Sequence, residues 1–152
     1  MIESKTAQTP AGTTARSRRR ARQQAPAHMI TADETSLLEA QLYLATLPIC
    51  ASGRVFVEVA SADQVGTLDA PSRMTVTWLV RERRGCTRAK GEQVSRAALA
   101  WLSEMADDTA GRPHAVLLGG YLGTAEIADQ LVSRFGYDRA EIVASESFKH
   151  LI

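Results

Sequence analysis

Apolar positions along the chain change between a strand-like and a helix-like spacing. Three short runs rich in apolar and β-branched residues predict strands, at 54–60 (RVFVEVA), 74–80 (MTVTWLV) and 114–118 (HAVLL). Weaker patterns predict strands at 27–31 and 141–145. Nearly every residue of 54–60 is apolar, which is typical of a strand covered on both faces of a sheet.

Three other segments have the i, i+3, i+4 spacing of amphipathic helices. The first lies within 32–48, with Thr35 and Ser36 as alternative N-caps, the second spans 94–105 and the third spans 124–135. Together with the strands they give the order β-α-β-β-α-β-α-β. This order predicts an α/β fold: an open, five-stranded, mostly parallel, Rossmann-like sheet with helices on both faces.

Two connections are harder to interpret from the pattern. Residues 61–71 join the second and third strands without a clear helix, although parallel strands require a crossover. We expect a helical turn or a reduced crossover there. Residues 81–92 (RERRGCTRAKGE) are predicted as a basic loop.

Charge separates the beginning of the chain from the rest. Six of the 18 Lys and Arg residues but one of the 17 Asp and Glu residues lie in 1–27, which leaves 12 basic and 16 acidic residues in 28–152. We therefore predict a disordered basic tail at 1–26 and one α/β domain at 27–152. The arginines of 16–22 could contact nucleic acid or anionic lipid electrostatically, but a solvated tail or a vestigial linker is the favoured interpretation.

The composition excludes several classes of protein. Cys50 and Cys86 have neither zinc-site spacing nor a disulfide framework, and Cys50 is expected to be buried or half-buried. His28, His114 and His150 show no ligand spacing, so no metal site is expected. No apolar run approaches the length of a membrane span and no secretory signal precedes the domain, so the expected compartment is the cytoplasm.

Three blocks resemble one protein family. ADETSLLEA at 32–40 is similar to the family's G-D-E-T-A-L-P-A turn, FVEVA at 56–60 to its second strand, and VTWLVR at 76–81 to its V-T-W-L-x-R strand. Together they resemble the C-terminal half of siderophore-interacting proteins over about 28–149. That family belongs to the ferredoxin-reductase-like flavoproteins, which pair an FAD-binding barrel with a nicotinamide-binding α/β domain.

The chain departs from this family at several positions. Ala32 and Leu38 replace a glycine and a proline, and residues 118–121 (LGGY) replace a strand end of the type A-G-E. Residues 145–149 (SESFK) keep an aromatic residue and a cation of the family's S-G-Y-W-R. The resemblance places Lys149 near the flavin, which makes it a weak catalytic candidate.

The candidate site residues follow the ends of the predicted strands. Gly119 and Gly120 allow close backbone approach to a ligand, although a tight turn explains them equally well. Asp33, Glu34 and Thr35 lie on the first strand-to-helix turn, which faces the cofactor cleft in the resembling family. There Thr35 and the helix N–H groups suit a pyrophosphate, and the acids suit a ribose hydroxyl or a backbone amide, while plain helix capping is the alternative.

Three arginines follow the third strand. Arg81, Arg83 and Arg84 could pair with the 2′-phosphate of NADPH, because a guanidinium group binds phosphate through two hydrogen bonds. A solvated basic loop is the alternative. Trp78 and Trp101 are expected to be core or half-buried residues.

The resemblance implies the NAD(P)H-binding part of a ferric-siderophore reductase system. NADPH or NADH would be the cofactor, FAD would belong to a separate barrel protein, and the ferric siderophore would be an indirect substrate. A non-catalytic binding or regulatory module without redox activity is the alternative. A nucleic-acid partner is not expected.

Overall fold

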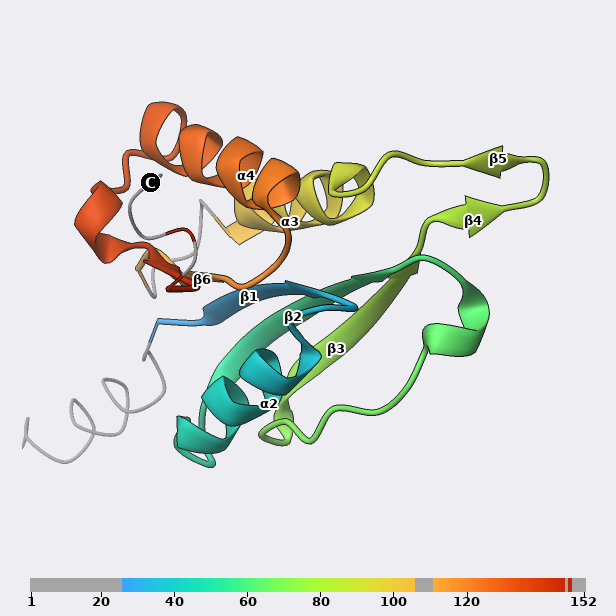
Figure 1. Cartoon of the computed structure of the whole chain (residues 1–152). Helices are drawn as coiled ribbons and strands as arrows, with labels where there is room; N and C mark the ends of the chain where they lie inside the picture. Colours follow the sequence, from blue (N-terminus) through green and yellow to red (C-terminus); the bar gives the residue numbers. More distant parts are fainter. Residues whose placement is uncertain (1–25, 106–110, 147, 149–152) are drawn as a thin grey trace, which may run out of the picture.

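The central feature of the computed structural model, which describes residues 26–105, 111–146 and 148, is a five-stranded parallel sheet (Figure 1). Its strand order is β3-β2-β1-β6-β7, and every neighbouring pair is parallel. This confirms the predicted α/β fold class. The strands are β1 (His28–Asp33), β2 (Ser52–Val59), β3 (Arg73–Val80), β6 (His114–Leu117) and β7 (Val143–Ala144).

Helices cover both faces of this sheet (Figure 1). Helix α2 (Leu37–Thr46) packs on one face, and α3 (Glu92–Met105) and α4 (Tyr121–Ser133) pack on the other. Each face has its own hydrophobic core, one containing Met29 and the other Ile30. Because side chains alternate along a strand, the residues of β1 divide between these two cores.

The alternation brings polar residues to the α3/α4 face at the carboxyl end of the sheet. Thr31 and Asp33 follow Met29 with a period of two, so they lie on the face that α3 and α4 cover. Asp33 pairs in register with Glu58 of β2, and Thr31 pairs with Leu117 of β6. Polar and charged side chains from the neighbouring strands β1 and β2 therefore meet at the carboxyl end of the sheet.

Several local details differ from the pattern-based prediction. The crossover between β2 and β3 contains a short 3-10 helix, η1 (Ala62–Gln64), in line with the expected helical turn. The predicted basic loop is wrong in part, because β4 (Glu82–Arg83) and β5 (Cys86–Thr87) pair as an antiparallel hairpin. A positive φ of 75° at Gly85 suits the tight turn between these strands.

Element ends also shift. Helix α4 begins three residues before the predicted start, because backbone Gly120 serves as its N-cap. Strand β7 is shorter than predicted, because η2 (Arg139–Glu141) takes up the preceding residues. Cys50 is exposed rather than buried, since it lies in the turn after Pro48 and outside both cores.

Other predictions concern core residues and the chain ends. Trp101 is buried and Trp78 is partly buried against the α2-side core, as expected. The predicted basic tail lies almost wholly within residues 1–25, and Lys149 lies within 149–152; both are outside the described residues.

Candidate functional site

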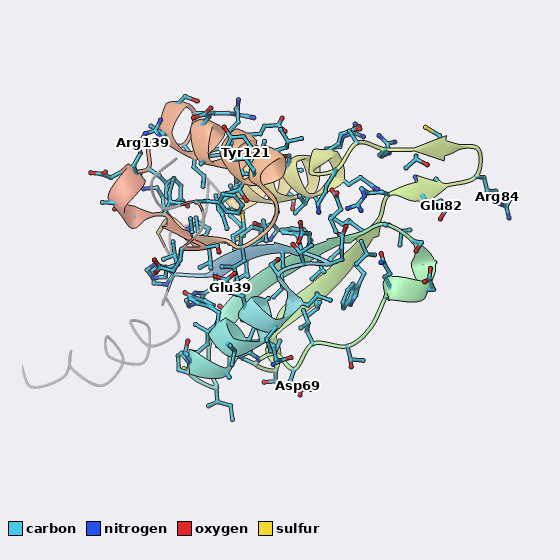
Figure 2. All side chains as sticks on the ribbon, viewed as in Figure 1. Glu39, Asp69, Glu82, Arg84, Tyr121 and Arg139 are labelled. Carbon is cyan, nitrogen blue, oxygen red and sulfur yellow. The ribbon has the colours of Figure 1, made fainter. Side chains whose placement is uncertain are left out.

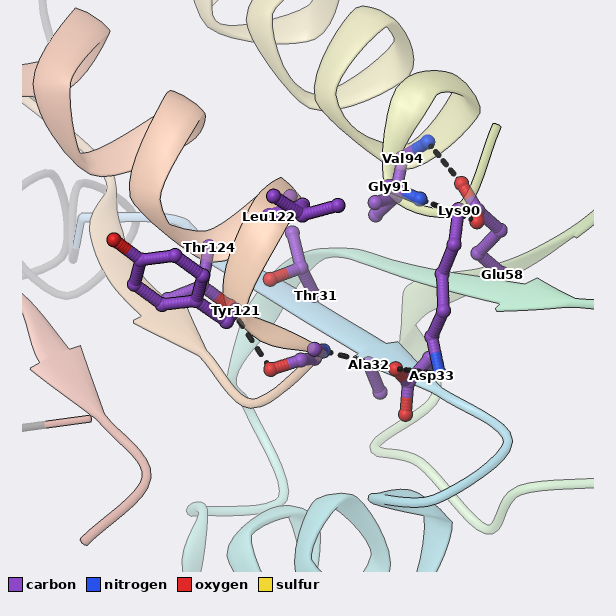
Figure 3. A pocket seen from close by; sticks show the side chains of 13 residues that line it. Thr31, Ala32, Asp33, Glu58, Lys90, Gly91, Val94, Tyr121, Leu122 and Thr124 are labelled. Carbon is purple, nitrogen blue, oxygen red and sulfur yellow. Dashed lines mark hydrogen bonds and ion pairs between the residues drawn. The ribbon is translucent and has the colours of Figure 1, made fainter. Parts of the chain in front are cut away.

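A pocket of about 210 Å³ lies at the carboxyl ends of β1 and β6 (Figure 3). The strand order reverses between these two strands, because the chain builds β1, β2 and β3 outward in one direction and then returns to place β6 on the other side of β1. Parallel sheets bind ligands at such a switch point. The residues used below that line the pocket include Thr31, Asp33, Lys90 and Gly120.

Asp33 connects three segments around the pocket. Its Oδ1 accepts hydrogen bonds from the backbone N (2.9 Å) and the hydroxyl (2.6 Å) of Thr35. Its Oδ2 accepts from the backbone N of Gly120 (2.8 Å) and lies 3.2 Å from the ammonium of Lys90. Burial alone would raise the pKa of Asp33, but the Thr35 hydrogen bonds and Lys90 outweigh it and lower the pKa.

Thr35 and Ser36 therefore serve the turn itself. The Thr35 hydroxyl donates to Asp33. Ser36 is the N-cap of α2, as expected, but its side chain does not cap the helix. Its Oγ instead accepts a hydrogen bond from the backbone N of Asp33 at 2.9 Å.

Arg81 is buried between two carboxylates. Its Nη2 lies 2.7 Å from Oε1 of Glu34, and its Nη1 lies 3.1 Å from Oε1 of Glu58. The hydrogen bond from Arg81 lowers the pKa of Glu34. Arg81 is 8% exposed, so the solvated-loop interpretation is wrong for this residue.

Glu58 links this ion pair to the start of α3. Its Oε1 accepts from the backbone N of Gly91 (2.7 Å), and its Oε2 accepts from the backbone N of Gln93 (3.1 Å) and of Val94 (3.0 Å). Free N–H groups and the helix dipole make a helix N-terminus favourable for a carboxylate. The buried Glu58 therefore occupies the anion-binding position of α3.

Glu58, Lys90 and Thr31 were missed by the sequence interpretation. A single acid in the otherwise apolar FVEVA run was the available signal for Glu58, because a charge in a strand covered on both faces requires partners. Lys90 was indistinguishable from the other cations of its loop. Thr31 looked like an ordinary strand residue.

The Thr31 hydroxyl is buried at the pocket without a partner. The residue is 1% exposed, and its Oγ1 forms no hydrogen bond with a described residue. Figure 3 shows this hydroxyl pointing toward the first turn of α4. Helix α4 has Gly120 as its N-cap and so has no capping side chain.

Arg83 and Arg84 lie away from this pocket. Both are exposed on the β4–β5 hairpin, and Figure 2 shows Arg84 at the tip of that hairpin. Of the predicted binding residues, Asp33 and Gly120 are hydrogen-bonded to each other at the pocket wall, and Gly119 also lines the pocket. Glu34 is connected to Asp33 through Lys90, whose ammonium lies 3.5 Å from Oε1 of Glu34.

Two searches of the described residues give negative results. No group of three or more His, Cys, Asp or Glu side chains in 26–105, 111–146 and 148 could hold a metal ion. None of the helices in that part of the chain is both long and apolar enough to cross a membrane.

The chain matches known proteins in its family and fold. A family model of siderophore-interacting proteins matches residues 25–146. A siderophore utilization protein from T. fusca is 28% identical, with a TM-score of 0.59 over 79% of this chain and 43% of its own. The siderophore-interacting protein SipS from Aeromonas hydrophila shares the fold at 16% identity, with a TM-score of 0.56 over 84% of this chain and 51% of its own.

The chain therefore spans about half the length of the solved structures it matches. No curated protein matches it. Because the family model covers most of the chain, including every strand of the parallel sheet, the chain belongs to the siderophore-interacting protein family.

Proposed function

We propose that this chain supplies the NAD(P)H-binding part of a ferric-siderophore reductase system in iron uptake. The observation that carries the proposal is the pocket between the carboxyl ends of β1 and β6 in a member of this family. Nucleotides bind parallel α/β sheets at this kind of position. The relative from T. fusca, a siderophore utilization protein, supports the role in siderophore use.

The residues around the pocket fit one end of a nicotinamide nucleotide. Gly119 and Gly120 let a ligand approach the backbone closely, and the Thr31 hydroxyl has no partner among the described residues. Glu34 is partly exposed beside Lys90 and can accept a hydrogen bond from a ribose hydroxyl. When bound, reduced nicotinamide supplies a hydride, whose two electrons a flavin on a separate barrel protein can pass singly to Fe(III).

The phosphate contacts of the nucleotide are assigned to cations outside the buried network. Arg81 directs its guanidinium at Glu34 and Glu58. We therefore propose the exposed Arg83 and Arg84 of the hairpin as partners of a 2′-phosphate, so that NADPH would bind more tightly than NADH. The hairpin follows β3 directly, at the carboxyl end of the sheet (Figure 1). The pocket lies at the same end of the sheet.

A non-catalytic binding module is the second candidate. It is favoured by the residues after β6, where Gly119, Gly120 and Tyr121 bring no carboxylate to the pocket. Such a module would keep the pocket and bind the nucleotide without passing electrons. Reduction of a ferric siderophore distinguishes the two functions.

A cytoplasmic location fits both candidates. Cys50 and Cys86 are free and exposed, which suits a compartment that keeps thiols reduced. We propose the cytoplasm for this reason.

Titration of the purified chain with NADPH and NADH, followed by quenching of tryptophan fluorescence, tests the proposal. We expect dissociation constants on the order of micromolar and a preference for NADPH. Arg84→Ala should remove that preference, whereas Arg139→Ala, an exposed arginine in η2, should keep it. Absence of binding at millimolar nucleotide would contradict the proposed function.

A second step adds an FAD-barrel protein and a ferric siderophore to the NADPH-loaded chain. Formation of Fe(II), measured with a ferrous chelator, supports the reductase. If the nucleotide binds tightly but Fe(II) forms no faster than with the barrel protein alone, the result supports the non-catalytic module.

A further inference from the structure

Another cavity lies at the opposite end of the sheet from the pocket between β1 and β6. Its volume is about 390 Å³, and its lining comes from the end of α3, from the residues just before β6 and from the residues just after α4. Because Pro113 directly precedes β6, this cavity lies at the amino end of that strand, and we call it the amino-end cavity. The proposed function gives it no role.

The floor of the amino-end cavity is apolar and held in place. Leu102 and Tyr137 are buried, and they line the cavity together with Met105 and Phe135, which are partly buried. The Tyr137 hydroxyl donates a hydrogen bond to the carbonyl of Pro113 at 2.7 Å, and burial raises the pKa of this phenol to about 12. The phenol is therefore neutral, and its proton is already engaged within the protein. The floor offers a ligand apolar and aromatic surface.

Two exposed arginines line the same cavity. The guanidinium carbon of Arg112 lies 5.3 Å from the centre of the Tyr137 ring, and that of Arg134 lies 5.2 Å from the centre of the Phe135 ring. Arg112 donates one hydrogen bond to the carbonyl of Gly136, although a guanidinium group carries five N–H donors. Neither arginine forms an ion pair with a described carboxylate. Most of their donors are thus available to a ligand.

This combination suits an anion with an apolar body. A guanidinium group binds a carboxylate through two parallel hydrogen bonds, and stacking on an aromatic ring leaves the N–H donors at its edge free. The described lining contains two cations and no carboxylate. The nearby Glu141 accepts a hydrogen bond from the backbone N of Asp138 within η2. The charge of the cavity therefore favours a negatively charged ligand.

We propose that the amino-end cavity binds a small aromatic carboxylate, whose charge Arg112 and Arg134 hold and whose ring packs on the apolar floor. A simple phosphate would use the arginines but leave the floor in water. A neutral ring would cover the floor but leave the arginines without a partner. The cavity and the pocket between β1 and β6 lie at opposite ends of the sheet, so this site does not depend on the proposed function.

Three probes titrated into the full chain and followed by chemical shifts test the ligand class. 2-Naphthoate carries both ring and charge, 2-naphthamide carries the ring alone, and acetate carries the charge alone. We expect naphthoate to bind with a dissociation constant below about 1 mM and the other two to bind at least about tenfold more weakly. Equal binding of naphthoate and naphthamide would overturn the inference, as would no response to millimolar naphthoate.

Arginine variants test the location of the site. Arg134→Gln should weaken naphthoate binding about fivefold and leave the melting temperature unchanged, because this side chain forms no hydrogen bond with a described residue. Arg112→Gln should weaken binding to a similar extent and also lower the melting temperature, since it loses the bond to Gly136. Arg139→Gln, in η2 and outside the lining, is the matched control and should bind normally. Unchanged affinity in both cavity variants would refute the site.

Two further measurements separate this site from its rivals. Asp107 and Asp108 follow α3 in the sequence and lie outside the described residues, so they are tested as partners of the two arginines within the chain. Replacing both by Asn should leave the affinity for naphthoate unchanged. Binding seen only in that double variant would assign the arginines to these carboxylates and overturn the inference.

The second measurement is competition with NADPH. Saturating NADPH should not displace naphthoate, because the cavity and the pocket between β1 and β6 lie at opposite ends of the sheet. Displacement would place naphthoate in that pocket and refute the amino-end site. If naphthoate binds and depends on Arg134 while no nucleotide binds, the inference stands and only the proposed function fails.

Discussion

At the scale of single residues, the buried Glu58 carboxylate joins β2 to α3 and to Arg81. It accepts from three backbone N–H groups at the start of α3 and from the Arg81 guanidinium. Arg81 continues to Glu34, and Lys90 continues from Glu34 to Asp33. Three carboxylates and two cations thus alternate in space across the carboxyl end of the sheet. This arrangement keeps the buried charges paired, which a low-dielectric environment requires.

We expect Glu58→Gln to destabilise the protein by about 2–4 kcal/mol, because a buried charged acceptor is removed from Arg81 and from a helix N-terminus. The urea midpoint, converted with a common m-value, measures the change. Glu82→Gln, on the exposed hairpin, is the control and should change stability by less than about 0.5 kcal/mol. Equal effects of the two variants would show that the Glu58 network contributes little.

At the scale of elements, α3 and α4 approach each other through glycines. A Cβ built on Gly91 would lie 2.6 Å from the backbone N of Gly123, and one built on Gly123 would lie 3.0 Å from the Cα of Gly91. Gly91 also has a φ of 89°, a conformation that L side chains rarely adopt. This contact holds the starts of the two helices close together at the pocket.

Gly91→Ala is expected to destabilise the protein by about 1–3 kcal/mol more than Gly85→Ala, because both positions have positive φ but Gly91 alone of the two has backbone within contact of the added methyl group. Chemical denaturation of both variants measures the difference. The same Gly91 variant should weaken nucleotide binding, since the start of α3 must move. Similar losses of stability in the two variants would refute the steric explanation.

At the scale of the whole molecule, titrating groups at the two ends of the sheet act in different pH ranges. At the amino end, burial lowers the pKa of His28, and the neighbouring His114 lowers it further; their ring centroids are 5.1 Å apart. At the carboxyl end, the pKa values of Asp33 and Glu34 are lowered. Acidification therefore lowers the stability of the fold through groups at both ends of the sheet. As the pH falls, the effect of His28 begins at a higher pH than that of the two carboxylates.

The sign for His28 follows from which state binds the proton more readily. The unfolded chain has a histidine pKa of about 6.5, and the folded value is lower, so acidification favours the unfolded state in that interval. We expect stability to be constant above about pH 7, to fall as the pH drops through 6.5 toward the folded pKa, and to fall again below about pH 4 as Asp33 and Glu34 are protonated.

Urea midpoints measured at intervals between pH 8 and pH 3 test this profile. His28→Gln should remove most of the first decrease and keep the second. His114→Gln should only reduce the first decrease, because burial is the larger cause of the His28 shift. An unchanged first decrease in His28→Gln would assign it to another group.

Much of the fold could be predicted because it depends on local pattern. Runs rich in apolar and β-branched residues located the strands β2, β3 and β6, and the helical spacing located α2 and α3. Errors arose where tertiary contacts override local preference. The glycine contact between α3 and α4 supports an early helix start through Tyr121-Leu122-Gly123, and the 81–92 segment pairs with itself as a hairpin.

The sequence by itself determined the order of strands and helices, the family blocks and the glycines of the pocket, because these follow from spacing and residue type. Only the tertiary structure decided what the polar residues do. Asp33 meets Gly120 across 87 residues of sequence, Glu58 meets the start of α3 across 33 to 36, and Arg81 meets Glu34 across 47. Hydrogen bonding and charge pairing depend on distances in space, which parallel strands create between segments far apart in the chain.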